Sequence, residues 1–260
     1  MRKLLLLLCF ILSHWGIINA QDKKTIRSEQ NPFSEARFTY FKETIVLFNE
    51  YLETKNGSFN TTNFRILKPL GNRAWTIRFD APLISTNSNT INKSGLGDLS
   101  LATSFIPYLT KKSGIATRLK IASNSANNPN FGSGKWVISP AIFYGTYIDT
   151  NKKLLLISDL EYQFSVAGSK NRADIRTTVI ESTLIYSFAK NWISSNIAFR
   201  YNETRQGFQN STFVEFGRKL TPDSLFYIHP SLAFGDQKNI QLRFRTWRCY
   251  FILKENTLNL

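Results

Sequence analysis

The 260-residue chain contains few cysteines, histidines and methionines, and its body lacks any long apolar run. It has two cysteines, two histidines and one methionine, and Cys9 and His14 lie within the first 20 residues. Beyond residue 20 only Cys249 and His229 remain, which excludes an internal disulfide and a zinc site. No later stretch reaches the roughly 20 apolar residues of a transmembrane helix. If this chain crosses a membrane, a closed β-sheet is the remaining solution, because lipid leaves no backbone polar group unpaired.

The first 20 residues have the layout of a secretory signal peptide. Arg2 and Lys3 form a short basic region, an apolar run follows over 4–12, and small or polar residues lead to Ala20. This layout predicts export with cleavage after Ala20. The run is too short for a membrane anchor, and Cys9 lacks the small neighbours of a lipoprotein signal.

The chain is strongly basic. Its formal net charge is +15, from 33 Lys and Arg against 18 Asp and Glu, and the loss of Arg2 and Lys3 leaves +13. In an exported protein, this surplus favours anionic lipid head groups or lipopolysaccharide as partners and makes nucleic acid a poor one. Diffuse solvation of a charged surface is the alternative interpretation.

The rest of the chain alternates between apolar and polar residues in segments of about ten, separated by clusters of Asn, Ser, Gly, Asp and Lys. In 75–80, for example, Trp75, Ile77 and Phe79 share one face of a strand and Arg78 and Asp80 share the other. This pattern predicts an all-β fold, a transmembrane antiparallel up-and-down β-barrel of about 12 strands. A soluble β-sandwich is the alternative. The expected strands are 41–52, 60–69, 73–85, 97–108, 114–123, 135–147, 153–167, 174–188, 191–202, 210–219, 224–234 and 238–252.

The lengths of the connections support the barrel. Gaps after even-numbered segments are short, whereas gaps after odd-numbered segments are mostly longer, as in 86–96 and 124–134. Short periplasmic turns that alternate with long outer loops are typical of outer-membrane barrels, and they place both chain ends in the periplasm. Rings near strand ends are expected at the lipid head groups; these are Tyr51, Tyr108, Tyr147 and Tyr201.

The predicted organisation is therefore a signal peptide over 1–20, a polar and loosely packed periplasmic leader over 21–36, the barrel over 37–253 and a C-terminal tail over 254–260. The predicted location is the bacterial outer membrane. No internal repeat or second domain is visible.

Two glycine motifs give the chain a resemblance to a known family. The motifs are Gly95-Leu96-Gly97-Asp98, after Pro82, and Gly132-Ser133-Gly134-Lys135-Trp136, before Pro140. With them the chain resembles the outer-membrane barrels of the phenol-degradation meta-pathway family, which are grouped as transporters. The resemblance is strongest over 73–145 and implies an outer-membrane barrel with a transport role.

The motifs also have a direct physical interpretation. Glycines at 95, 97, 132 and 134 suit bulges or tight turns at a barrel rim. Asp98 can accept hydrogen bonds from loop N–H groups, and we expect Asp98 and Lys135 to lie close enough to pair. An architectural role and a ligand-contacting rim both remain open.

Catalysis finds little support in the sequence. His229 is the one histidine after residue 20, no serine lies in a Gly-x-Ser-x-Gly turn, and no phosphate loop is present. We therefore expect no enzyme, no catalytic residues, no metal and no cofactor. A lipid-modifying enzyme that uses His229 is the competing hypothesis, together with a non-transporting structural barrel.

A charged lumen is the predicted site. By alternation we assign to it Arg65, Arg78, Asp80, Arg118, Lys120, Asp159, Glu161, Glu181, Arg200, Glu215, His229, Arg243 and Arg245. Basic and acidic walls could orient a polar solute, or the same groups could fill the barrel as ion pairs. The predicted function is a pore or transporter for a small, unidentified solute. The expected partners are outer-membrane lipid, lipopolysaccharide and the barrel-assembly machinery.

Overall fold

The computed structural model describes residues 30–35, 38, 40–54, 57–71, 74–87, 92–221, 224–236 and 240–252, without the side chains of 240–252. The predicted signal peptide, most of the leader and the tail lie outside these residues. None of the described residues forms a helix long and apolar enough to cross a membrane.

Strands make up the regular structure of the described part. They are β1 (Thr44–Thr54), β2 (Gly57–Leu70), β3 (Trp75–Asn87), β4 (Asn92–Leu96), β5 (Ser100–Leu109), β6 (Ser113–Ala122), β7 (Lys135–Tyr147), β8 (Leu154–Gly168), β9 (Arg176–Phe188), β10 (Asn191–Asn202), β11 (Gly207–Phe208), β12 (Asn210–Thr221), β13 (Ser224–Phe234) and β14 (Ile240–Ile252). All pairings are antiparallel.

The sheet closes on itself. β14 pairs with β1, and β9 pairs with β10, so the twelve longer strands of the described part form a closed ring. The short strand β4 pairs with β3 on the same side as β5 does, and it continues the position of β5 in the wall. In the same way, β11 pairs with β10 on the side of β12 and continues the position of β12. The 14 strands of the described part therefore occupy twelve positions in the wall, which confirms the predicted up-and-down barrel.

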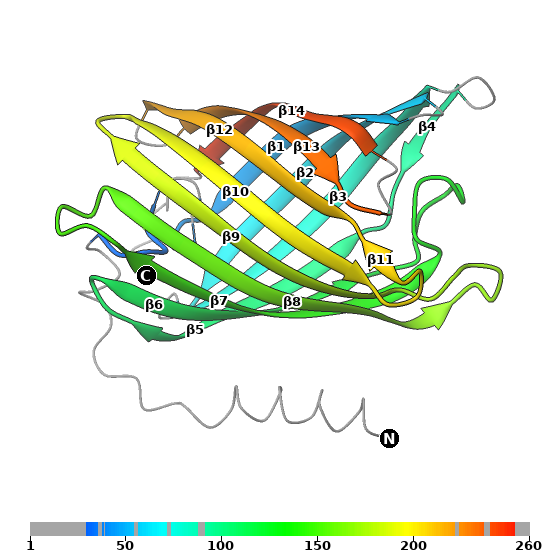
Figure 1. Ribbon diagram of the computed structural model, residues 1–260, viewed down its shortest axis with the longest axis horizontal. Helices are drawn as coiled ribbons and strands as arrows, with labels where there is room; N and C mark the ends of the chain where they lie inside the picture. Colours follow the sequence, from blue (N-terminus) through cyan, green and yellow to red (C-terminus); the bar gives the residue numbers. More distant parts are fainter. Residues whose placement is uncertain are drawn as a thin grey trace, which may run out of the picture.

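The two ends of the barrel differ, as the connection lengths predicted. In Figure 1 the strands run diagonally between an end of short turns on the left and an end of longer loops on the right. We call the short-turn end, with connections 110–112, 148–153 and 189–190, the base. The opposite end, with connections 123–134 and 169–175, is the mouth. The length rule for outer-membrane barrels predicts that the base faces the periplasm.

The outer surface of the wall is apolar. Along β3, Ile77 and Phe79 are exposed while Thr76 and Asp80 are buried, so successive side chains point out of and into the barrel. The same alternation on other strands exposes a belt of large apolar side chains, among them Leu101, Ile142, Leu160, Ile180, Ile197, Phe199, Phe216, Ile228 and Leu232. A continuous apolar belt around a closed barrel is the surface that lipid requires.

The base is filled by an apolar core inside the barrel. Inward-facing residues of β1, β7, β8, β9, β10 and β13 form one cluster: Val46, Phe48, Tyr147, Leu155, Ile157, Ile185, Trp192, Leu225 and Tyr227. Tyr147 is 1% exposed, so its predicted place at the lipid head groups is wrong. Its inward parity on β7, shared with the buried Ala141, overrides its position at a strand end.

Candidate functional site

Residues 30–35, 38, 40 and 41 lie inside the base of the barrel. Asn31 and Pro32 are fully buried, and Phe33 joins Phe41 in a second apolar cluster against β5 and β6. Gly114 and Gly145 make room for this segment, because a Cβ on either would crowd the Phe33 ring or Pro32. Residues 30–35, assigned by composition to a loosely packed leader, therefore pack inside the barrel.

Polar contacts hold the same segment to the wall. The Tyr147 hydroxyl lies 2.6 Å from a Glu35 carboxylate oxygen, and the Ser187 hydroxyl lies 3.2 Å from the other. The Tyr40 hydroxyl donates to the Ala74 carbonyl. Strands β7 and β9 and the residue before β3 are thus tied to one short segment.

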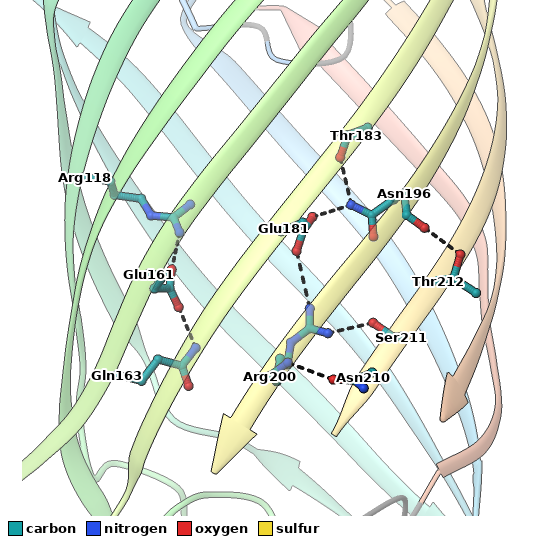
Figure 2. Close-up of polar contacts among 10 residues, drawn as sticks. All are labelled: Arg118, Glu161, Gln163, Glu181, Thr183, Asn196, Arg200, Asn210, Ser211 and Thr212. Atoms are coloured by element: carbon teal, nitrogen blue, oxygen red, sulfur yellow. Dashed lines mark hydrogen bonds and ion pairs between the residues drawn. The ribbon is translucent and has the colours of Figure 1, made fainter. Parts of the chain in front are cut away.

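Above the base, polar side chains of both signs line the interior. We call this set the central belt; it comprises Arg65, Arg78, Asp80, Arg118, Lys120, Asp159, Glu161, Glu181, Asn196 and Arg200. Every member occupies an inward-facing position of its strand, as Figure 2 shows for five of them.

Arg118 and Glu161 meet over a small residue. Arg118 on β6 pairs in register with Ala141 on β7, which pairs with Glu161 on β8. Because Ala141 is short, the guanidinium reaches across it to form an ion pair with the carboxylate, and Gln163 also donates to Glu161 (Figure 2). The Arg118 guanidinium also lies over the Phe143 ring, 4.8 Å from its centroid.

Glu181 is held in the same way. It lies opposite Ala198, which is fully buried, and the longer side chains on either side of that alanine point toward it. Asn196 Nδ2 donates to Glu181 at 2.8 Å, and Arg200 approaches from the other side at 3.4 Å (Figure 2). Small residues at inward positions, Ala141 between β6 and β8 and Ala198 opposite Glu181, thus leave space in which long polar side chains meet.

The opposite wall is basic. Asp80 on β3 forms ion pairs with both Arg65 and Arg78. Arg78 and Lys120 lie on either side of Ala102 in one row across β3, β5 and β6. Within the described part Lys120 makes no direct hydrogen bond or ion pair, although the carboxylates of Asp80 and Glu161 lie near enough to interact with its charge.

The acidic wall also contains a carboxylate that is not engaged. Asp159 on β8 lies directly opposite Glu181 on β9, and it makes no ion pair or hydrogen bond with any described residue. Basic residues therefore gather on β2, β3 and β6, and acidic residues gather on β8 and β9. The interior has two walls of opposite sign, bridged by Arg118–Glu161, while Arg200 of β10 pairs with Glu181 on the far side of the acidic wall.

Glu215 and His229 lie deeper, among the apolar residues of the base. Glu215 is fully buried and accepts from Trp192 Nε1 at 2.8 Å, and it lies 3.2 Å from His229 Nδ1. Trp192 lies over Gly217, where a Cβ would overlap the indole. His229 is 3% exposed and packs on the Phe213 ring, with 3.7 Å between ring centroids. This is a packed polar cluster.

The side chains of Arg243 and Arg245, also assigned to the lumen, lie outside the described part. Their backbones pair with Ser231 and His229 respectively. No group of three or more His, Cys, Asp or Glu among the described residues could hold a metal ion.

The rim motifs organise the loops of the mouth. Asp98 accepts hydrogen bonds from the backbone of Ala126 and from both the backbone and the hydroxyl of Ser133. A Cβ at Gly132 would overlap the Asp98 carboxylate, so the glycine permits this close approach. Gly134 has a φ of +70°, which favours glycine.

The predicted Asp98–Lys135 pair is wrong. Lys135 forms its ion pair with Asp174 of the β8–β9 loop at 2.9 Å, because its position on β7 directs it to the neighbouring β8 side. This hydrogen bond from Lys135 is the largest of the influences that lower the pKa of Asp174 below its ordinary value of 3.8. Trp136, next in the chain, is 45% exposed on the outer surface.

Sequence reasoning did not single out three parts of this interior. Asn196 and Gln163 carry no charge and were passed over, although their inward parity placed them beside Glu181 and Glu161. The alanines at 102, 141 and 198 were also missed; small residues at inward positions of alternating strands were their signal. Phe33, Phe38 and Phe41 were the signal for the segment in the base.

The fold is that of known outer-membrane barrels. An outer membrane channel from Pseudomonas putida F1 has a TM-score of 0.66 and 12% identity over 82% of this chain and 96% of its own. The NanC porin has a TM-score of 0.59 and 11% identity, and the KdgM porin in complex with oligogalacturonate has 0.58 and 10%. Both cover 81% of this chain and 99% of the porin.

No family model and no curated protein matches the chain. The closed wall, the apolar outer belt and the likeness to these barrels identify an outer-membrane β-barrel with a porin-like fold.

Proposed function

We propose that the protein is an outer-membrane channel for small polar solutes that prefers anions and whose base is closed by its own residues 30–41. The observation that carries the proposal is the gathering of Arg78, Arg118 and Lys120 on one wall of a polar interior, where Lys120 has no direct hydrogen bond or ion pair with a described residue. A barrel that only needed filling would pair or replace this ammonium group, because an unpaired charge in a packed interior is costly.

The preference for anions follows from the basic wall. Basic side chains that line a pore favour anionic species. The resemblance of the rim motifs to the meta-pathway transporter family and the channel-like fold support a transport role. Lipid and lipopolysaccharide are the partners that we propose for the apolar belt and the basic surface, and the assembly machinery for insertion.

Ion selectivity tests this proposal. In planar bilayers with a salt gradient, Lys120→Glu should move the reversal potential toward cations. The matched control is Lys170→Glu, an equal charge change at an exposed position of the β8–β9 loop. The shift should shrink at high salt, because the Debye length falls from about 10 Å at 0.1 M to about 3 Å at 1 M. Both variants should be recorded in the full mature chain and in a chain lacking 22–41, so that a closed base does not hide the belt.

Equal reversal potentials for the wild type and Lys120→Glu would contradict the proposal and favour a barrel filled by ion pairs. The enzyme hypothesis has its own test. The Glu215–His229 pair resembles the carboxylate–imidazole unit of a general base, but its burial gives a lipid substrate no access. We expect no lipid turnover by purified protein; turnover that is lost in His229→Ala would establish the enzyme instead.

A further inference from the structure

A cavity of about 320 Å³ lies between three loops at the mouth of the barrel, at the lower end of the size range of small-molecule sites. The β6–β7 loop, the β8–β9 loop and the β10–β11 turn each contribute to its walls. Its lining comprises Gly132, Ser133, Arg172, Ala173, Asp174, Ile175, Asn202, Arg205 and Gln209.

The walls of this cavity are held in place before any ligand arrives. Asp98 fixes the backbone at Ser133, and Asp174 accepts from both Lys135 and the Ser165 hydroxyl. Arg172 donates to the Pro129 carbonyl, and its aliphatic part packs against Gly134. A binding site whose side chains are already ordered loses less entropy when the ligand binds.

The groups that face this cavity are mostly hydrogen-bond donors. Arg172 uses one terminal nitrogen for Pro129, and its remaining guanidinium N–H groups have no partner among the described residues. Asn202 accepts from the Arg205 backbone through Oδ1, which leaves its amide nitrogen available in the same part of the structure.

The net charge of the cavity is positive. By formal count its lining carries the two positive charges of Arg172 and Arg205 and the one negative charge of Asp174, which also pairs with Lys135. Arginine binds a carboxylate through two parallel hydrogen bonds, and amide N–H groups bind hydroxyl oxygens. The chemistry of the cavity therefore matches a small organic anion that carries a carboxylate and hydroxyl groups.

The cavity also leads toward the central belt. Asn202 and Arg200 are successive inward-facing residues of β10, roughly 7 Å apart along the strand at 3.3 Å per residue. Arg200 contacts Ser211 and Glu181, so donors continue from the mouth to the belt.

We infer that this cavity is a capture site for a hydroxylated organic anion, such as a sugar acid, held by Arg172, Arg205 and Asn202 before it enters the lumen. The inference rests on the proposed channel function and specifies where its solute is first recognised. Binding at this site precedes passage, so it can be measured separately from conduction.

Equilibrium dialysis of the full mature protein in detergent tests the site, with D-glucuronate as the anionic probe and D-glucose as the neutral one. The wild type should bind glucuronate and not glucose. Arg172→Gln and Arg205→Gln should each weaken glucuronate binding by roughly tenfold or more, since each removes a charged hydrogen bond. Lys170→Gln removes a charge from the same loop outside the cavity and should leave binding unchanged.

Arg205→Gln leaves the Arg172–Pro129 contact intact, so weaker binding by this variant cannot come from loss of that loop contact. All variants should also show the heat-modifiable gel migration of the wild type, which reports a folded barrel. Absence of glucuronate binding by the wild type overturns the capture site, as does equal weakening in Lys170→Gln, which would indicate diffuse charge. A wild type that conducts ions but does not bind leaves the channel standing without the site. A wild type that binds but does not conduct leaves the site standing without the channel.

Discussion

The base and the central belt of this barrel are built from the same alternating strands, yet they do different things. In the base, inward positions carry Trp192, Tyr227 and Leu155, which pack with residues 30–41 into an apolar core. In the belt, inward positions carry charged residues around small alanines such as Ala141 and Ala198. One architecture thus supports a closed, stabilising end and a polar middle that can interact with solutes.

This comparison predicts that stability depends mainly on the base. Trp192→Ala removes a buried indole that packs edge-on against Tyr227, with 66° between the ring planes, and donates to Glu215. We expect a loss of about 3–5 kcal/mol in the free energy of unfolding, as for other large aromatic truncations. Denaturant unfolding followed by far-UV circular dichroism measures this loss. A smaller loss of unfolding free energy than in the belt variant Arg118→Met with Glu161→Gln would contradict the view that stability depends mainly on the base.

Gly217→Ala sharpens the same point without removing any side chain. A Cβ at 217 would overlap the Trp192 indole, which must move and give up its hydrogen bond to Glu215. We expect a loss of about 1–3 kcal/mol, from overpacking and an unsatisfied buried group. The control is Gly71→Ala at the β2–β3 turn, where a Cβ meets nothing within 4 Å but φ is +51°. Gly71→Ala should lower the free energy of unfolding through backbone strain and leave the tryptophan fluorescence unchanged. Gly217→Ala should change both the free energy of unfolding and the fluorescence.

The belt should respond in the opposite way. Replacing the Arg118–Glu161 pair by Arg118→Met with Glu161→Gln removes both charges at once, so neither is left unpaired. We expect a change in stability below about 1 kcal/mol, because the pair is partly exposed to the lumen. The double variant should nevertheless change ion selectivity in planar bilayers. A large loss of stability with unchanged selectivity would assign the pair to the structure alone.

The smallest expected effect concerns the turn between β7 and β8 at the base. The backbone N–H groups of Leu154 and Lys153 donate to the Asp149 carboxylate, and these bonds hold its pKa below the ordinary value of 3.8. The stabilisation is therefore complete above that value and is lost as the pH falls through the lower folded-state pKa. Asp149→Asn should slightly lower the thermal midpoint at pH 7, and the difference from the wild type should shrink below pH 3.8. Asn151→Ala, in the same turn, should show a difference that does not depend on pH.

Much of the wall could be predicted from the sequence because β-strand alternation is a local property. Parity alone placed Arg118 and Glu161 inside and Ile77 and Phe79 outside. Strand lengths and the short turns of the base followed from the same pattern and from the punctuation by Asn, Ser, Gly and Asp.

Contacts that depend on the path of a loop could not be predicted. The pairing of Lys135 with Asp174 depends on how the β8–β9 loop folds back, which residue spacing does not encode. The polar composition of the segment 30–41 gave no sign that it packs inside the barrel. In the structure Phe33 packs beside Gly114, and Phe33 and Phe41 form one cluster with Ile106. Tyr147 was misplaced because strand-end position was given more weight than parity.

Single-channel conductance with and without the N-terminal segment tests the central claim most directly. A mature chain lacking residues 22–41 should be less stable than the full mature chain, because it loses Phe33 and Phe41 from the core of the base. Once inserted in a bilayer it should conduct severalfold more, because the segment that packs inside the base is gone. Gln30→Ala is the control, since it shortens an exposed side chain of the same segment and leaves the buried Asn31, Pro32 and Phe33 in place; its conductance should equal that of the wild type. Equal conductance of the truncated and full chains would contradict the claim that residues 30–41 close a solute path through this barrel.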